Sequence, residues 1–344
     1  MSEASLSTYY TTIYPTKCPP DPRFLVSKEG LAFCCQIIGF ISLPMHFFTG
    51  YCILMKTPAT MKHVKLSLVN LNIWYIISQV IVSFFITSYN FYPSLASFSV
   101  GYATALNFPT VVQICILYTI NDAVHVSITL LFEIRSSLIL KNRFRISSSR
   151  GRGYWLAGNF FGTVFITSPV FFNLADQNAE KMKILEAIPC PSKEFFLEPI
   201  TVFATSGAWN TYLLISRSLK SIYMLQIIFF TSCCIYYLVI VKTDQVSAQT
   251  RRIQARSFYG LIIQTLIPAA FTLIPSVLIS SRSAPDQLVN NLVSISYAVH
   301  IVVGSLAILL VHHPYRLFIK SIFVKSKESV IVPVVSTSMF KVIK

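Results

Sequence analysis

Seven long apolar stretches are separated along the chain by shorter polar segments. They cover residues 31–55, 64–88, 103–134, 154–174, 222–241, 258–280 and 288–311. A helix of about 20 apolar residues crosses the hydrocarbon core of a bilayer, which is roughly 30 Å thick. The pattern therefore predicts an all-α membrane protein, built as a bundle of seven transmembrane helices.

The third stretch contains an acidic residue near its middle. Asp122 lies within Val111–Arg135, a run that is otherwise long and apolar enough to span a bilayer. An ionisable side chain at membrane depth costs about 2.5 kcal/mol or more, so Asp122 is expected to face protein or a wet cavity. Other helices must therefore surround this one, and we expect it to be central in the bundle.

Composition and charge agree with this class of protein. The chain is 54% hydrophobic and 12% charged, with a net charge of +15. The segments after stretches 1, 3 and 5 and the C-terminal tail, counted with Lys65 and Glu133 at the adjoining ends of stretches 2 and 3, hold 19 of the 28 Lys and Arg residues and three of the 13 acids. By the positive-inside rule this side is cytoplasmic, which places the N-terminus outside and the C-terminus inside. The basic charge thus reflects topology and contact with lipid, and nucleic acid is not an expected partner.

These patterns divide the chain into three parts. We expect an extracellular N-terminus over 1–29, the bundle over 30–311, and a cytoplasmic tail over 312–344. The N-terminus has no apolar core typical of a cleavable signal peptide, so the first stretch is expected to direct insertion. Apolar residues beside lysines over 314–325 predict a short amphipathic helix on the inner leaflet.

Six of the eight cysteines lie inside the apolar stretches, where they behave as small hydrophobic residues. The other two, Cys18 and Cys190, are both expected outside. An oxidising environment permits a disulfide between them, although their spacing alone does not decide whether they meet.

The sequence contains none of several common catalytic motifs. The chain contains no HExxH, GxSxG, Walker or CxxC sequence, and the last apolar stretch has no lysine for a retinal Schiff base. We therefore expect neither a cofactor nor a metal site, and no enzymatic activity.

Two helical faces are candidates for ligand binding. Tyr118, Asp122 and His125 share one face of the third helix, and Tyr297 and His300 are three residues apart in the seventh. Such residues can hold a small polar ligand through hydrogen bonds, charge and aromatic area. The alternative is structural: an aspartate paired with His125, or a polar site that holds an ion or water.

A set of short motifs is spread over most of the chain. They are Thr57-Pro58, Met61-Lys62, Val64-Lys65, Leu68, Asn70-Leu71, Trp74, Phe132-Glu133, Arg135, Pro189-Cys190-Pro191, Thr250-Arg251, Gln254, Gln264, Pro268, Pro275 and His313-Pro314-Tyr315-Arg316. In these motifs the sequence resembles the nematode serpentine chemoreceptors of class H (Srh), in the Str superfamily. The joint pattern is specific for the superfamily and less specific for class H against the neighbouring classes.

The resemblance implies a G-protein-coupled chemosensory receptor for an external small molecule, an odorant or pheromone, in the plasma membrane and its sensory cilia. In rhodopsin-like receptors an acid and an arginine at the inner end of the third helix hold the inactive arrangement. The residues implied in coupling to a heterotrimeric G protein are Glu133, Arg135, Arg251 and Arg316. Pro268 and Pro275 would allow a hinge in the sixth helix.

The chain departs from the family where Ile134 and Ser136 replace the usual Asn and Tyr, which leaves open a receptor that has lost signalling. A ligand-gated channel or a small-solute transporter is the other alternative, although Asp122 is the only acidic residue away from the end of a stretch. The segment over 175–219 is long enough for a lid over an outer cavity, or it is a solvated connector.

Overall fold

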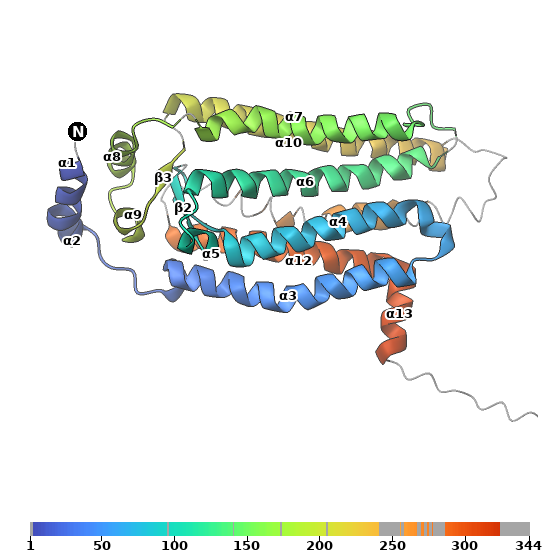
Figure 1. The fold of residues 1–344 in the computed structure, drawn as a ribbon, viewed down its shortest axis with the longest axis horizontal. Helices are drawn as coiled ribbons and strands as arrows, with labels where there is room; N and C mark the ends of the chain where they lie inside the picture. Colours follow the sequence, from blue (N-terminus) through green and yellow to red (C-terminus); the bar gives the residue numbers. More distant parts are fainter. Residues whose placement is uncertain are drawn as a thin grey trace, which may run out of the picture.

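The computed structural model describes residues 3–94, 96–139, 141–172, 174–203, 206–240, 255, 258–266, 270–271, 274, 277 and 286–323. In this part of the chain, long helices lie side by side along the long axis of the molecule (Figure 1). They are α3 (Lys28–Lys56), α4 (Lys62–Val80), α6 (Thr110–Ser137), α7 (Ser149–Phe172), α10 (Ser206–Ile235) and α12 (Gln287–Val311). Residues 258–266, from the sixth predicted stretch, are also helical.

Four helices of the described part are long and apolar enough to cross a membrane. They are Lys28–Lys56, Lys62–Phe85, Thr110–Ser137 and Gln287–Val311, and a shorter apolar helix covers Ser221–Ile235. Large apolar side chains such as Phe40, Leu66 and Phe165 point away from the bundle and are exposed. Exposed apolar surface on this scale is what a lipid-facing helix requires. The protein is therefore a mostly helical, multi-pass membrane protein.

The fifth long helix begins earlier than the sequence indicates. The apolar pattern predicts its start near residue 222, whereas α10 begins at Ser206 and thus includes Arg217 and Lys220. Backbone hydrogen bonding continues through polar residues that hydropathy assigns to the preceding loop. The loop after α7 is correspondingly shorter than predicted.

The prediction that the chain is wholly α-helical is wrong at one end of the bundle. α4 continues as a π-helical turn over Ile81–Phe85, and the chain then forms strands β1 (Thr87–Asn90) and β2 (Ala96–Val100). They pair antiparallel with Thr87 opposite Val100, and β3 (Thr201–Val202) pairs antiparallel with β2. The short helix α5 (Tyr102–Ala105) follows the sheet, so the third long helix starts at Thr110 and not near residue 103.

The N-terminal segment packs over the same end. Helices α1 (Glu3–Thr8) and α2 (Tyr14–Lys17) lie beside α8 (Gln177–Ala187) and α9 (Glu194–Leu197), as Figure 1 shows. Cys18 and Cys190 are joined in a disulfide with a Cα–Cα distance of 5.4 Å. We call the sheet, these four helices and the disulfide the cap.

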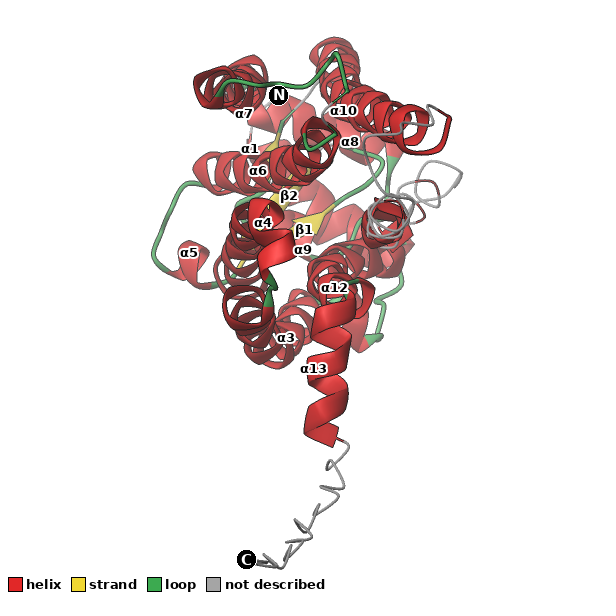
Figure 2. Ribbon diagram, turned by 90° about the vertical axis from the view of Figure 1, so that its right-hand side faces the viewer, coloured by secondary structure: helices red, strands yellow, loops and turns green. Residues whose placement is uncertain are grey.

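The opposite end carries the last described helix. α13 (His313–Phe323) runs roughly perpendicular to the long helices (Figures 1 and 2). Its Tyr315 is fully buried, and the Tyr315 hydroxyl lies 2.7 Å from Oγ1 of Thr57 just after α3. Lys56 lies over the ring of Phe318 at 4.3 Å from its centre. These contacts fix α13 against the bundle at the end opposite the cap.

Helix packing in the bundle depends on a close approach between α4 and α12. A Cβ atom built on Gly304 would come within 2.6 Å of the ring of Tyr75, which is itself buried. Only glycine leaves room for this tyrosine. α4 also packs on α6, where Asn70 Nδ2 donates to Ser127 Oγ at 2.8 Å. Asn70 thus joins α4 to the central helix.

Candidate functional site

The first candidate site lies on α6, which contacts α4, α7 and α10. Tyr118, Asp122 and His125 recur at helical spacing on it, and each is partly buried. His125 Nδ1 lies 2.8 Å from the carbonyl oxygen of Asn121, one turn earlier. α6 therefore presents a carboxylate, an imidazole and a phenol to the middle of the bundle.

α12 contributes two further aromatic side chains to the same place. The Tyr297 hydroxyl donates a hydrogen bond to Oδ1 of Asn121 on α6. Its phenol also lies within electrostatic reach of Asp122 and Tyr118. The imidazole of His300 stacks near the Tyr297 ring, with 5.3 Å between ring centres, and is within reach of His125. The five residues predicted for ligand binding are thus brought together from α6 and α12.

α10 and α7 complete the set. Tyr223 on α10 is buried, its ring centre is 6.0 Å from that of His125, and its phenol is within electrostatic reach of Asp122. The Tyr223 hydroxyl bonds with Oγ1 of Thr163 and donates to the carbonyl oxygen of Asn159 on α7 at 3.2 Å. Gln226 Nε2 donates to Oδ1 of Asn159 at 2.7 Å.

We call this set the central polar cluster; its members are Tyr118, Asn121, Asp122, His125, Asn159, Thr163, Tyr223, Gln226, Tyr297 and His300. It offers hydrogen-bond donors and acceptors, one carboxylate and several aromatic rings from four helices. A small polar or aromatic molecule needs such groups for binding. Movement of any one helix would change the distances within the cluster.

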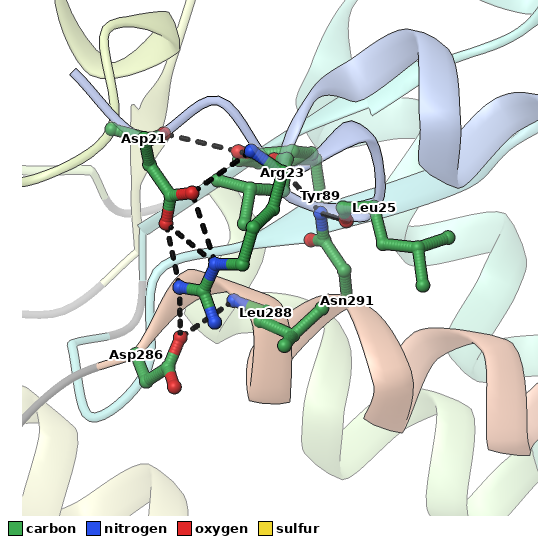
Figure 3. A network of polar contacts seen from close by, with 9 residues as sticks. Asp21, Arg23, Leu25, Tyr89, Asp286, Leu288 and Asn291 are labelled. Atoms are coloured by element: carbon green, nitrogen blue, oxygen red, sulfur yellow. Dashed lines mark hydrogen bonds and ion pairs between the residues drawn. The ribbon is translucent and has the colours of Figure 1, made fainter.

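The cap is tied to the beginning of α12 by buried polar contacts (Figure 3). Asn291, which is fully buried, donates through Nδ2 to the carbonyl oxygens of Leu25 and Val26 at 2.8 and 3.0 Å. The Tyr89 hydroxyl donates to the same Val26 oxygen at 2.7 Å. Burial is the main reason that the pKa of Tyr89 is raised, so its hydroxyl remains a donor.

Charged residues add a second connection there. Arg23 pairs with Asp21 at 2.5 Å and with Asp286 at 3.3 Å (Figure 3). Hydrogen bonds from Arg23 lower the pKa of Asp21. Asp286 also caps α12 by accepting from the backbone N–H of Leu288 at 2.9 Å. The N-terminal segment, the hairpin and α12 therefore meet at one point.

The second candidate site lies at the end of α6 opposite the cap. Glu133 is fully buried, and both its carboxylate oxygens accept from Arg152 on α7, at 2.7 and 3.1 Å. Ser137 Oγ donates to Glu133 at 2.6 Å. Glu133 therefore pairs with Arg152 and not with Arg135, because side chains two residues apart on a helix do not face each other.

Arg135 points instead toward α10 and the start of α13. Its Nε is buried and, within the described residues, makes no hydrogen bond. Its charge acts on Cys234, Tyr315 and His312. Burial, with Arg135 and Arg316 nearby, lowers the pKa of His312 to about 3. Arg251, Pro268 and Pro275 lie outside the described residues.

A family model supplies the decisive comparison. Residues 26–325 match the serpentine type 7TM GPCR chemoreceptor Srh. This chain belongs to the Srh family. The matched range takes in every long helix described above and α13, and it confirms the resemblance seen in the sequence. The Srh family is a chemoreceptor family and not an enzyme family.

The Srh match begins at residue 26, so Cys18 lies before it and Cys190 within it. The part of the cap formed by α1, α2 and Cys18 therefore lies before the matched range.

Sequence reasoning missed several members of this Srh chain's polar sites. Asn121 and Tyr223 lie in the central polar cluster, and Arg152 holds Glu133. Asn121 had a sequence signal, since it adjoins Asp122 in an apolar stretch. Arg152 had none, because hydropathy places it in a loop rich in basic residues.

Proposed function

We propose that this Srh chain is a seven-transmembrane, G-protein-coupled chemosensory receptor for an external small molecule. Its N-terminus (1–29) is extracellular, residues 30–311 form the bundle, and residues 312–344 are cytoplasmic. This orientation is supported by the concentration of Lys and Arg on one side. The proposed location is the plasma membrane.

The observation that carries the proposal is the central polar cluster. Tyr118, Asp122, His125, Tyr297 and His300 are proposed as ligand contacts because they join α6 to α12 beneath the cap. Polar groups grouped at membrane depth are expensive and are typical of functional sites. Aromatic rings add apolar area, so the expected ligand is small and partly aromatic or polar.

Signalling requires the ligand to prefer one arrangement of the helices. A molecule that binds two states equally well shifts no equilibrium. The cluster is suited to this role because its hydrogen bonds cross from α6 to α12 and from α10 to α7. We propose that ligand binding changes these contacts and, through α6, the surroundings of Glu133 and Arg135.

Coupling to a heterotrimeric G protein is proposed for the inner face. Arg135 has a buried nitrogen without a hydrogen-bond partner in the described part of the chain, and it lies between α10 and the start of α13. Separation of these helices would expose a cation that a G protein can bind. Arg316, in the first turn of α13, and Arg251 are proposed as further contacts at this face.

The proposal is tested in cells that express the chain with an N-terminal epitope, using a panel of volatile and water-soluble molecules and a calcium readout. Antibody binding to intact cells tests the orientation. We expect a response that is lost in Arg135→Ala at equal surface expression and under G-protein blockade. A current or calcium rise that survives both would favour the ligand-gated channel.

A further inference from the structure

The inner loop between α6 and α7 is strongly basic and contains three consecutive serines. Its sequence over 141–152 is KNRFRISSSRGR, with no acidic residue. Residues 145–148 form no regular secondary structure, and the side chains of Ser147 and Ser148 are exposed. An exposed serine in a loop beside arginines can enter the active site of a protein kinase.

We propose that Ser148 is phosphorylated by an arginine-directed serine/threonine protein kinase. Arg145 and Arg143 stand three and five residues before Ser148. Kinases choose substrates largely by such charge patterns, because acidic subsites bind basic residues at fixed distances from the acceptor. The two arginines before Ser148 form such a pattern. Ser147 has them two and four residues before it, and Ser149 already begins α7.

The reaction uses ATP as the phosphoryl donor. The Ser148 oxygen forms a bond to the γ-phosphorus of ATP while the bond from that phosphorus to the bridging oxygen breaks. ADP leaves with the electron pair, and the hydroxyl proton passes to a carboxylate of the kinase. The product is a phosphoserine with a charge of about −1.5 to −2 at neutral pH.

The position of Ser148 connects this modification to the buried pair at the inner end of α6. Ser148 caps α7: its Oγ accepts from the N–H of Gly151 at 3.3 Å, and its carbonyl oxygen accepts from the N–H of Arg152 at 3.0 Å. Arg152 Nη2 also donates to the carbonyl oxygen of Ile146 at 3.0 Å. The Arg152 guanidinium, which holds Glu133, thus also bonds to the loop that carries Ser148.

A phosphate on Ser148 competes with Glu133 for Arg152. Phosphate accepts bidentate hydrogen bonds from arginine as carboxylate does, and it carries more charge. Transfer of the guanidinium to phosphate leaves Glu133 buried with Ser137 and weakens the connection between α6 and α7. This inference rests on the proposed orientation, which places the loop in the cytoplasm with ATP and kinases.

The first test uses the full chain, purified in lipid nanodiscs that expose both faces, with the catalytic subunit of cAMP-dependent protein kinase and ATP. Mass spectrometry should find phosphate on Ser148, and Arg145→Ala should lower the initial rate by about tenfold. Arg150→Ala, which alters an exposed arginine after the acceptor, should leave the rate unchanged. Absence of phosphate from Ser148, or equal rates in the two variants, would overturn the assignment.

The second test measures competition for Arg152 without ligand or G protein. Phosphorylation should lower the Tm of the parent receptor and should have a smaller effect on Glu133→Gln, which has no carboxylate to leave unpaired. An equal shift in both proteins would overturn the competition. Because neither assay depends on signalling, failure here is distinct from failure of the proposed receptor function, which the epitope and calcium measurements test.

Discussion

Arg152 on α7 holds both carboxylate oxygens of Glu133 on α6, and Glu133 is fully buried while Arg152 retains some exposure. Removal of one partner from a buried ion pair leaves a charge without compensation, which costs more than removal of both partners. The pair therefore couples the position of α7 to the end of α6 that carries Arg135.

Arg152→Ala is expected to reduce the free energy of unfolding by about 3 kcal/mol, because Glu133 would remain buried without its ion-pair partner. Glu133→Gln combined with Arg152→Ala should recover part of this loss. Denaturant unfolding in detergent micelles measures both. Arg150→Ala is the matched control and should change stability by less than about 0.5 kcal/mol. Equal stability of Arg152→Ala and Arg150→Ala would contradict the role given to the pair.

Cys18→Ser should loosen the cap without unfolding the bundle. The disulfide closes a sequence separation of 172 residues, and loss of a disulfide typically costs about 2–4 kcal/mol. We expect faster proteolysis of residues 1–27 in the variant, while the helical circular dichroism signal is retained. Cys115→Ser, a change at a free cysteine in α6, is the control. Equal protection of the N-terminal segment in both variants would show that the disulfide is not what holds it.

Asn291→Ala should separate the N-terminal segment from α12. The carbonyl oxygen of Leu25 would lose its donor in a buried site, and that of Val26 would keep only the hydrogen bond from Tyr89, which costs about 2 kcal/mol. Ser296→Ala, on the same helix, removes only a bond to Leu292 of that helix and should cost little. Unfolding of the two variants side by side measures the difference, and no difference would mean that water replaces the lost donor.

His312 is expected to make the receptor sensitive to acid. Its pKa is lowered to about 3 by burial and nearby arginines, whereas an exposed histidine has a value near 6.5. Below pH 6.5 the unfolded chain therefore binds more protons than the folded chain. The free energy of unfolding decreases as the pH is lowered, by up to about 1.4 kcal/mol per pH unit. His312→Asn should reduce this slope between pH 6 and 4 in thermal unfolding. An unchanged slope would mean that His312 is not the residue responsible.

The sequence predicts the helical bundle well because hydropathy reports directly on burial in lipid. Helices α3 and α12 begin and end within a few residues of the predicted stretches. The hairpin β1–β2 escaped prediction because β1 begins at the end of an apolar run, and the alternation of Thr87, Ser88 and Tyr89 is too short to distinguish from a helix end.

Most predicted site residues are polar residues that interrupt an apolar stretch, although Asn121, which also interrupts one, was missed. Asp122 and His300 are conspicuous because they stand within long apolar stretches. Arg152 is one of several basic residues in its loop, and only tertiary structure selects it as the partner of Glu133. Helical periodicity excludes Arg135 from that role, but it does not identify the residue that fills it.

The central claim is that the central polar cluster receives an external molecule and controls a G protein. The most direct measurement is nucleotide exchange on a purified heterotrimeric G protein by the receptor in nanodiscs, with an agonist from the calcium panel. We predict that agonist accelerates exchange, and that Asp122→Asn and Tyr297→Phe each shift the half-maximal concentration at least tenfold while Ser296→Ala does not. Exchange that is insensitive to agonist, or equal potency in all these variants, would contradict the account.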